Sequence, residues 1–172
     1  MKKINENNFA FIDSQNLNLG IQSLGWKLDI KRFRKYLLDK YQVNTAYLFI
    51  GFILENQDLY SSLQKYGYTL IFKPTLPDRD GDVKGNVDAD LVLQVMLDLD
   101  NFDKAVIVTS DGDFYSLVKY LYKKNKLRMV LSPYIETCST LLKGSAKDKI
   151  VYMANLREKL SYKEKYHQRT EP

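Results

Sequence analysis

Two carboxylates, Asp111 and Asp113, stand between an apolar segment and a helical pattern. Residues 105–109 are apolar or β-favouring at every position, and an apolar pattern of helical period begins at Phe114. A strand that is apolar on both faces is typical of a parallel α/β sheet, which holds its ligands beyond the carboxyl ends of its strands. A site and a structural role are equally compatible with this stretch, because Asp113 could cap the helix and Asp111 could be a turn residue.

Acidic residues occupy similar places elsewhere in the chain. Asp13 directly follows the apolar segment 9–12, and Asp88 opens a helical pattern after a long loop. In a parallel sheet of order 3-2-1-4-5, strands one and four are neighbours, so Asp13 and Asp111 would face each other at the topological switch point. Carboxylates at close range repel one another unless a cation neutralises them. Mg²⁺ or Mn²⁺ suits such an all-oxygen site and can assist the hydrolysis of a phosphodiester, a reaction that then needs no histidine.

Nucleotide and calcium motifs are missing from the sequence. No G-x-G-x-x-G follows the first apolar segment and no G-x-x-x-x-G-K-[ST] occurs anywhere, so dinucleotide binding and P-loop nucleotide binding have no support. The run of Asp78, Asp80 and Asp82 resembles the start of an EF-hand loop. It fails as one because Val83 stands where a glycine must turn the chain.

Cysteine and histidine chemistry is also restricted. Cys138 is the only cysteine, which excludes disulfides within the chain and cysteine-based zinc sites. His167 is the only histidine, and its polar carboxyl-terminal surroundings favour a solvated tail residue over a ligand or a base. Catalysis must therefore use carboxylates, lysines or a metal.

The pattern of apolar residues predicts the elements that position these side chains. Segments of strand type lie at residues 9–12, 45–54, 68–72, 105–109, 127–131 and 150–153, and helical patterns at 30–41, 56–66, 87–99, 114–124, 137–142 and 155–166. The alternation predicts an α/β fold, a three-layer Rossmann-like sandwich around a mainly parallel sheet of order about 3-2-1-4-5, with a C-terminal helix. We assign residues 1–154 to one domain and 155–172 to a C-terminal helix and polar tail. Residues 73–86 form the longest loop, and loops of that length are usually functional or disordered.

The composition suits a single globular domain. The chain has 172 residues, of which 45% are hydrophobic and 27% charged. No apolar run is long enough to span a bilayer, and the polar amino terminus leads directly into a strand, so we expect a cytoplasmic protein without membrane contact. The net charge of +5 permits an anionic partner without proving one.

Three motifs in this order carry a resemblance to a known family. They are F-I-D-S-Q-N near the amino terminus, K-G-N-V-D-A-D-L at the third helix, and V-T-S-D-G-D-F after the fourth strand. They resemble the NYN domain of LabA-like proteins, a branch of the PIN-like ribonuclease superfamily whose pattern is roughly D-x-x-N, K-x-x-x-D and S-G-D-G-D-F. The resemblance covers about residues 8–153. One departure is visible, because Thr109 and Ser110 occupy the places of the usual Ser and Gly, and a side chain at Ser110 could shift the turn.

The resemblance implies a PIN-like fold and metal-dependent cleavage of RNA. By position, the residues implied to hold Mg²⁺ or Mn²⁺ directly or through water, and so to be catalytic, are Asp13, Asp88, Asp111 and Asp113. Asn16 is implied to orient a water or a phosphate, and Lys84 to meet substrate phosphate as a point charge. The remaining predicted substrate contacts are Ser110 in the third motif, and Lys73 and Arg79 on the long loop.

These features lead to the hypothesis of a ribonuclease that hydrolyses single-stranded or unpaired RNA. The first alternative is a non-catalytic RNA-binding or regulatory module of the same fold, which the modest net charge leaves open. The second is a phosphohydrolase of small nucleotides, because the same metal site could serve any phosphate ester. The only tryptophan, Trp26, is expected to pack in the core or at the surface, with stacking on a base as the alternative. A homodimer is compatible with the sequence, which does not specify the oligomeric state.

Overall fold

The computed structural model describes residues 6–73, 76–77, 83–84, 87–134, 136 and 138–163. Of residues 76–77, 83–84 and 87 it describes the backbone alone.

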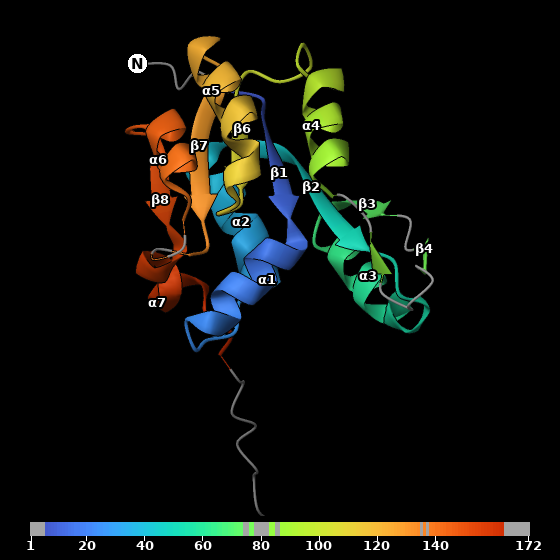
Figure 1. The fold of residues 1–172 in the computed structure, drawn as a ribbon. Helices are drawn as coiled ribbons and strands as arrows, with labels where there is room; N and C mark the ends of the chain where they lie inside the picture. The colour runs from blue at the N-terminus through green and yellow to red at the C-terminus, as the bar shows by residue number, and fades with distance from the viewer. Residues whose placement is uncertain are drawn as a thin grey trace, which may run out of the picture.

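A six-stranded parallel sheet forms the centre of the molecule (Figure 1). Its strands are β1 (Asn8–Asp13), β2 (Val43–Gly51), β3 (Thr69–Lys73), β6 (Ala105–Val108), β7 (Leu127–Ser132) and β8 (Ile150–Tyr152). Their order is β3-β2-β1-β6-β7-β8, which confirms the predicted order and adds β8 at one edge. Two short strands, β4 (Leu76–Pro77) and β5 (Val83–Lys84), pair antiparallel to each other within the long loop region.

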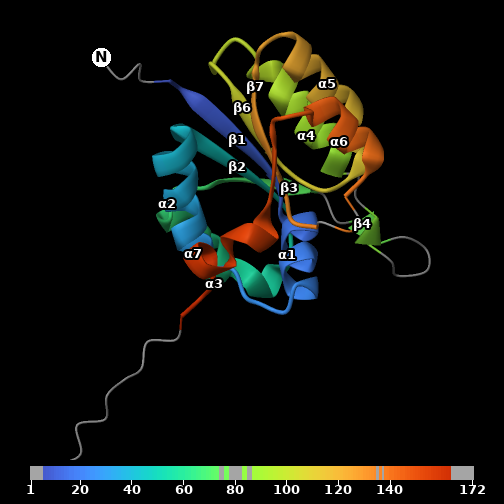
Figure 2. The same ribbon diagram turned by 90° about the vertical axis from the view of Figure 1, so that its left-hand side faces the viewer.

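Helices cover both faces of this sheet and make three layers (Figure 2). On one face lie α1 (Ser14–Ser23), α2 (Ile30–Tyr41), α3 (Gln57–Lys65) and α7 (Arg157–Leu160). On the other face lie α4 (Val87–Leu97), α5 (Tyr115–Lys123) and α6 (Thr140–Ala146). Three short 3₁₀ turns complete the described elements: η1 (Leu54–Asn56), η2 (Gly112–Phe114) and η3 (Met153–Leu156). The predicted three-layer α/β sandwich is confirmed.

Strand β1 explains why the fold has two apolar cores. Successive side chains of a strand point to opposite faces. Ala10 and Ile12 therefore join the core under α1, α2 and α3, and Phe9 and Phe11 join the core under α4, α5 and α6. Because all four side chains are buried, β1 is fixed at the centre of the sheet, and its carboxyl end cannot move relative to its neighbours without disturbing both cores.

Two details differ from the sequence-based expectations. Helix α1 was not expected, because only Leu17, Gly20 and Ile21 of its polar sequence are buried. Helix α7 ends at Leu160 and does not continue to residue 166. The chain instead becomes extended at Ser161, which forms an antiparallel bridge with Leu28. Because the segment between α1 and α2 offers this pairing partner, tertiary contacts override the local helical pattern.

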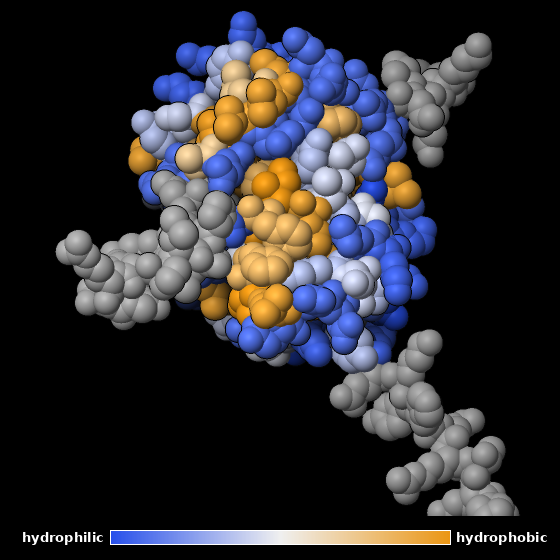
Figure 3. Space-filling view, turned by 90° about the vertical axis from the view of Figure 1, so that its right-hand side faces the viewer, coloured by the Kyte–Doolittle hydropathy of each residue, from blue (hydrophilic) through white to orange (hydrophobic). Residues whose placement is uncertain are grey.

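The edge of the sheet formed by β3 is notably apolar. Figure 3 shows apolar side chains gathered on the face that carries β3 and α4. The large apolar residues exposed there include Phe52, Phe72, Leu93 and Leu97. Among the described residues, no helix has the length and apolar character that crossing a membrane requires.

Candidate metal and nucleic-acid site

The site lies where β1 and β6 end side by side. Ile12 of β1 pairs with Val108 of β6, so the carboxyl ends of the two strands lie next to each other. Because β1 leads on to β2 on one side and β6 to β7 on the other, this gap is the topological switch point of the sheet. Asp13, the last residue of β1, is buried there and caps α1 by accepting a hydrogen bond from the Asn16 N–H at 3.1 Å.

Three carboxylates gather next to this gap. Asp88 comes from the first turn of α4, and Asp111 and Asp113 come from the turn after β6. One oxygen of each lies within 4.8 Å of the others, and we refer to these three residues as the carboxylate cluster. Asp13 is outside this close group but acts on it electrostatically, because its charge contributes to raising the pKa of Asp88.

The turn after β6 presents the cluster through its own hydrogen bonds. The Asp111 carboxylate accepts a hydrogen bond from the Asp113 N–H at 2.9 Å and so caps η2. The alternative that Asp113 caps the following helix is therefore wrong, because α5 begins after Phe114 without a side-chain cap. A carboxylate has two oxygens, so Asp111 can cap the turn with one and bind a ligand with the other.

Gly112 is required by a close approach. A Cβ at this position would lie 2.5 Å from Ser139 Oγ and 2.8 Å from Ser139 Cβ, which is too close for either atom. Ser139 caps α6, and its position is therefore tied to the turn that carries Asp111 and Asp113. The glycine between the two acidic residues of D-G-D thus serves packing against α6, a contact that the sequence alone did not indicate.

Asn16 and Ser110 connect the two strand ends. The Asn16 side-chain oxygen accepts a hydrogen bond from the Ser110 N–H at 2.8 Å. The buried Ser110 hydroxyl accepts a hydrogen bond from the Tyr134 N–H at 2.9 Å and lies 3.0 Å from Ser132 Oγ. Since the Ser132 hydroxyl donates its single hydrogen to the Tyr134 carbonyl, Ser110 is the donor to Ser132. Ser132 and Tyr134 are thus supporting residues that sequence reasoning missed.

The serine at position 110 does not distort the turn. Ser110 is not among the residues with positive φ, so the place of the family glycine is filled without backbone strain. The contacts described above fix the backbone from which Asp111 projects. The substrate roles predicted for Asn16 and Ser110 stay predictions.

Lys73 lies beside the carboxylates. It is the last residue of β3, and its residue surface is only 8% exposed. Burial lowers the pKa of the Lys73 amine, and the charges of Asp13, Asp88 and Asp90 oppose this effect. The expectation that Lys73 belongs to the long loop is wrong, because Lys73 is the last residue of β3 and is buried there. Its predicted contact with substrate stays a prediction. Arg79 and the side chain of Lys84, the other two predicted basic contacts, lie outside the described residues.

The acidic residues repel one another in the absence of a cation. Burial raises the pKa of Asp88, and the charges of Asp111, Asp13 and Asp113 raise it further against the opposing charge of Lys73. Burial likewise raises the pKa of Asp13, against the hydrogen bond from the Asn16 backbone and the charge of Lys73. A bound cation would relieve both effects, because it replaces lost hydration and cancels the repulsion.

This electrostatic arrangement predicts an unusual pH dependence of stability without metal. The pKa values of Asp13 and Asp88 in the folded state lie above the ordinary value of 3.8. At a pH between the ordinary and the raised pKa values, these two residues therefore bind more protons in the folded state than in the unfolded chain. Their contribution to stability is present at lower pH and is lost as the pH rises through the raised pKa values. In EDTA, we therefore expect Asp88→Asn to gain stability over the wild type between pH 4 and pH 7.

Urea unfolding of both proteins across this pH range measures the effect. Taking the difference between the two proteins removes the contributions of titrating groups that they share. Saturating Mg²⁺ should reverse the order at neutral pH, because only the wild type keeps all three carboxylates of the cluster. A difference that does not change with pH would contradict the predicted repulsion.

The carboxylate cluster fits a hard divalent cation. Its ligands are oxygens only, and they come from two separate elements, α4 and η2, that converge on one point. Mg²⁺ and Mn²⁺ bind through a few carboxylates and keep waters or substrate oxygens in their remaining positions. Asp88, Asp111 and Asp113 can each supply one carboxylate oxygen to such a cation.

Comparisons with known proteins identify the family of this chain. Residues 9–153 match the family model described as NYN domain. The chain is 26% identical over 133 residues to "Low amplitude and bright protein LabA" of Synechococcus elongatus, which covers 71% of each protein. It also shares its fold with a crystal structure of a protein of unknown function from Vibrio parahaemolyticus, with a TM-score of 0.71 and 22% identity, covering 89% of this chain and 96% of the other. The match extends over all three motifs noted in the sequence, and the chain belongs to the NYN domain family.

Proposed function

We propose that this protein is a Mg²⁺- or Mn²⁺-dependent ribonuclease that hydrolyses phosphodiester bonds of single-stranded or unpaired RNA. The observation that carries the proposal is the convergence of Asp88, Asp111 and Asp113 within 4.8 Å, beside the switch point of a parallel sheet. Membership of the NYN domain family, which is part of the PIN-like nuclease superfamily, supports RNA as the substrate.

The residues of the site suit this chemistry. Asp88, Asp111 and Asp113 would hold the cation, and Asp13 would add negative charge from its buried position. When bound, the cation would activate a water and stabilise the charge that develops on the phosphate during hydrolysis. Lys73 lies close enough to these carboxylates to interact with them, and its amine could hold a phosphate oxygen as a point charge. Hydrolysis adds water across one P–O bond and leaves a phosphate end and a hydroxyl end.

A cleavage assay with labelled RNA tests the proposal. A single-stranded oligoribonucleotide, the same strand in a duplex, and a DNA strand of equal sequence are incubated with Mn²⁺, Mg²⁺ or EDTA and resolved on a gel. We expect metal-dependent products from the single-stranded RNA and none in EDTA. Asp113→Asn, purified in parallel, controls for a contaminating nuclease.

Each result has a definite meaning. Products in the wild-type lanes alone establish a nuclease, and the fragment ladder distinguishes internal from terminal cleavage. RNA that shifts in a binding gel but is never cut would overturn the proposal in favour of a non-catalytic RNA-binding module. Phosphate release from mononucleotides without RNA cleavage would instead indicate a small-nucleotide phosphohydrolase.

A further inference from the structure

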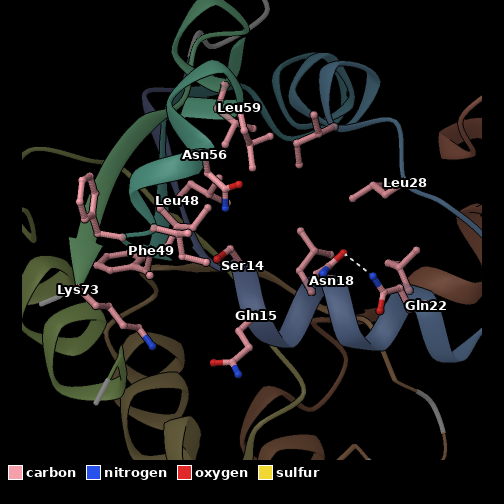
Figure 4. Close-up of a pocket in the computed structure, with 18 of the residues that line it drawn as sticks. Ser14, Gln15, Asn18, Gln22, Leu28, Leu48, Phe49, Asn56, Leu59 and Lys73 are labelled. Carbon is pink, nitrogen blue, oxygen red and sulfur yellow. Dashed lines mark hydrogen bonds between the residues drawn. The ribbon is translucent and has the colours of Figure 1, made fainter. Parts of the chain in front are cut away.

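A large pocket opens next to the carboxylate cluster. It has a volume of about 890 Å³ and lies between α1 and the segment from the end of β2 to α3. Figure 4 shows Asn18 and Gln22 along α1 on one side, Asn56 and Leu59 on the other, and Lys73 and Gln15 together at one end. This volume is within the range of ligand pockets and is sufficient for a nucleotide.

The charges that line the pocket favour an anionic ligand. Among the described residues that line it, Lys73 and Lys27 are basic and none is Asp or Glu. Most of the lining is apolar, as expected for a site that receives a flat apolar body. The Lys27 ammonium lies 5.0 Å from the centroid of the Tyr162 ring, which leaves Lys73 as the cation placed to meet a ligand. An apolar wall with a lysine at one end matches a nucleobase that carries a phosphate.

The polar and aromatic residues of the pocket provide the types of contact that a nucleobase makes. Gln15, Asn18 and Asn56 offer amide donors and acceptors, which can pair with the edges of an unpaired base. Phe52 also lines the pocket, where its ring stacks on Tyr60 and meets Phe72 edge-on, and 43% of the residue surface is exposed. A base could extend this aromatic group by packing against that exposed surface. Asn18 and Gln22 are exposed and linked to each other by a 3.3 Å hydrogen bond, and they can exchange this contact for one to a ligand.

Lys73 and the start of α1 connect the pocket with the acidic residues. Lys73 lines the pocket and also interacts electrostatically with Asp13 and Asp88. Ser14 and Gln15, which line the pocket, directly follow Asp13 in the chain. A phosphate held at Lys73 would therefore lie between the pocket and the cluster.

We propose that this pocket binds one unpaired nucleotide of the RNA substrate, with its base against Phe52 and its phosphate at Lys73. The inference rests on the proposed function and identifies how the site would select unpaired RNA. A base in a duplex is stacked and paired, and it could enter the pocket only after leaving its helix. Single-stranded RNA presents its bases without that penalty.

Trp26 makes this inference directly measurable. It is the only tryptophan of the chain, it lines the pocket, and it is 9% exposed. Its indole Nε1 has no hydrogen-bond partner among the described residues. Tryptophan emission therefore comes from a residue in the wall of this pocket, and its measurement requires neither metal nor cleavage. The sequence-based expectation that Trp26 packs in the core is confirmed, and its contact with the pocket is new.

The test is a fluorescence titration in EDTA. Wild-type protein is titrated with AMP, GMP, CMP and UMP, and separately with ribose 5-phosphate, which carries the phosphate without a base. We expect a saturable change in Trp26 emission with at least one nucleotide and none with ribose 5-phosphate. Phe52→Ala should weaken nucleotide binding about fivefold, which corresponds to the lower limit measured for stacking of one base. Leu54→Ala is the matched control, because Leu54 is exposed nearby and is not one of the lining residues.

The outcomes separate this inference from the proposed function. No saturable change with any nucleotide, an equal change with ribose 5-phosphate, or unaltered binding by Phe52→Ala would overturn the pocket assignment, even if the protein cleaves RNA. A nucleotide-specific change that depends on Phe52 supports the assignment, even if no RNA is cleaved. In a cleaving enzyme, RNA with a single abasic nucleotide should further be cut more slowly only where that nucleotide adjoins the scissile bond.

Discussion

Replacing Asp111 with Asn should abolish metal-dependent RNA cleavage while leaving the fold intact. Asp111 is the central member of the carboxylate cluster, since it lies on the same turn as Asp113 and is the first charge that raises the pKa of Asp88. Changes to residues that merely support a metal ligand reduce affinity or activity by about tenfold to a hundredfold. Loss of a ligand itself should therefore reduce the rate at least about a hundredfold.

The fold should survive because Asn keeps the structural contact of Asp111. The Asp111 carboxylate accepts a hydrogen bond from the Asp113 N–H, and an Asn side-chain oxygen can accept the same bond. Asp111→Asn also removes one of the charges that repel Asp88. Without metal, we expect the variant to be at least as stable as the wild type, although it is inactive.

Metal-induced stabilisation provides a second measurement. A cation present at 100 times its dissociation constant stabilises the wild type by about 2.7 kcal/mol, and the variant should gain much less. Thermal unfolding with and without Mg²⁺ or Mn²⁺ measures this difference. Asp39→Asn is the control, because this exposed carboxylate on α2 forms only a surface ion pair with Lys35. A variant as active as the wild type, in a preparation free of other nucleases, would remove Asp111 from the site.

The centre of the sheet could be predicted because strands β1 and β6 are largely apolar on both faces. Residues of β1 and β6 are buried at every position, and such segments leave few alternatives to the centre of a parallel sheet. The rule that ligands bind beyond the carboxyl ends of these strands then placed Asp13 and Asp111 near each other. This part of the site follows from topology, and topology follows from the alternation of strands and helices.

The supporting contacts could not be predicted, because they join residues that are distant in sequence. Ser110 is held by Ser132, and Gly112 by its approach to Ser139, yet none of these residues has a local pattern that indicates its partner. The pocket is formed by α1, a helix whose sequence shows few apolar residues. The pocket depends on the packing of α1 against β2, which no local pattern encodes.

The end of α7 shows a second limit of prediction from sequence. The helical pattern predicted a longer C-terminal helix, but the chain leaves the helix after Leu160 to pair with residues 27–29. The Asp29 N–H donates to the Leu160 carbonyl at 2.8 Å, and the Tyr162 N–H donates to the Lys27 carbonyl at 2.8 Å. These hydrogen bonds satisfy backbone groups that a longer helix would have satisfied locally. The choice between a longer helix and this extended pairing therefore depends on the tertiary fold.

Replacing Lys73 with Met should weaken RNA binding and leave metal binding intact or improved. Lys73 lines the pocket beside α1, and its charge acts on both Asp13 and Asp88. Its charge would attract a substrate phosphate but repel a cation in the carboxylate cluster. The two effects have opposite signs, so they can be distinguished in one variant.

The loss of a charged hydrogen bond sets the expected decrease in RNA affinity. Such bonds contribute about 1.5 to 3 kcal/mol, so KM for RNA should rise about tenfold to a hundredfold. The slope of log affinity against log salt concentration should also fall by about 0.7, the value for one phosphate contact to a single strand. Met preserves the length of the side chain and its apolar contacts at the end of β3, so the fold should be retained.

Two further variants, compared with Lys73→Met, make the measurement specific. Lys73→Arg keeps the charge and should restore most of the RNA affinity, whereas Lys35→Met removes a lysine from the exposed pair on α2 and should change neither KM nor the salt slope. Metal affinity, measured by thermal stabilisation in Mn²⁺, should not decrease in Lys73→Met. If RNA affinity and metal affinity fell together, Lys73 would be a structural support of the carboxylate cluster. If RNA affinity fell alone, the burial of this lysine near Asp13, Asp88 and Asp90 would be explained by the phosphate that it meets.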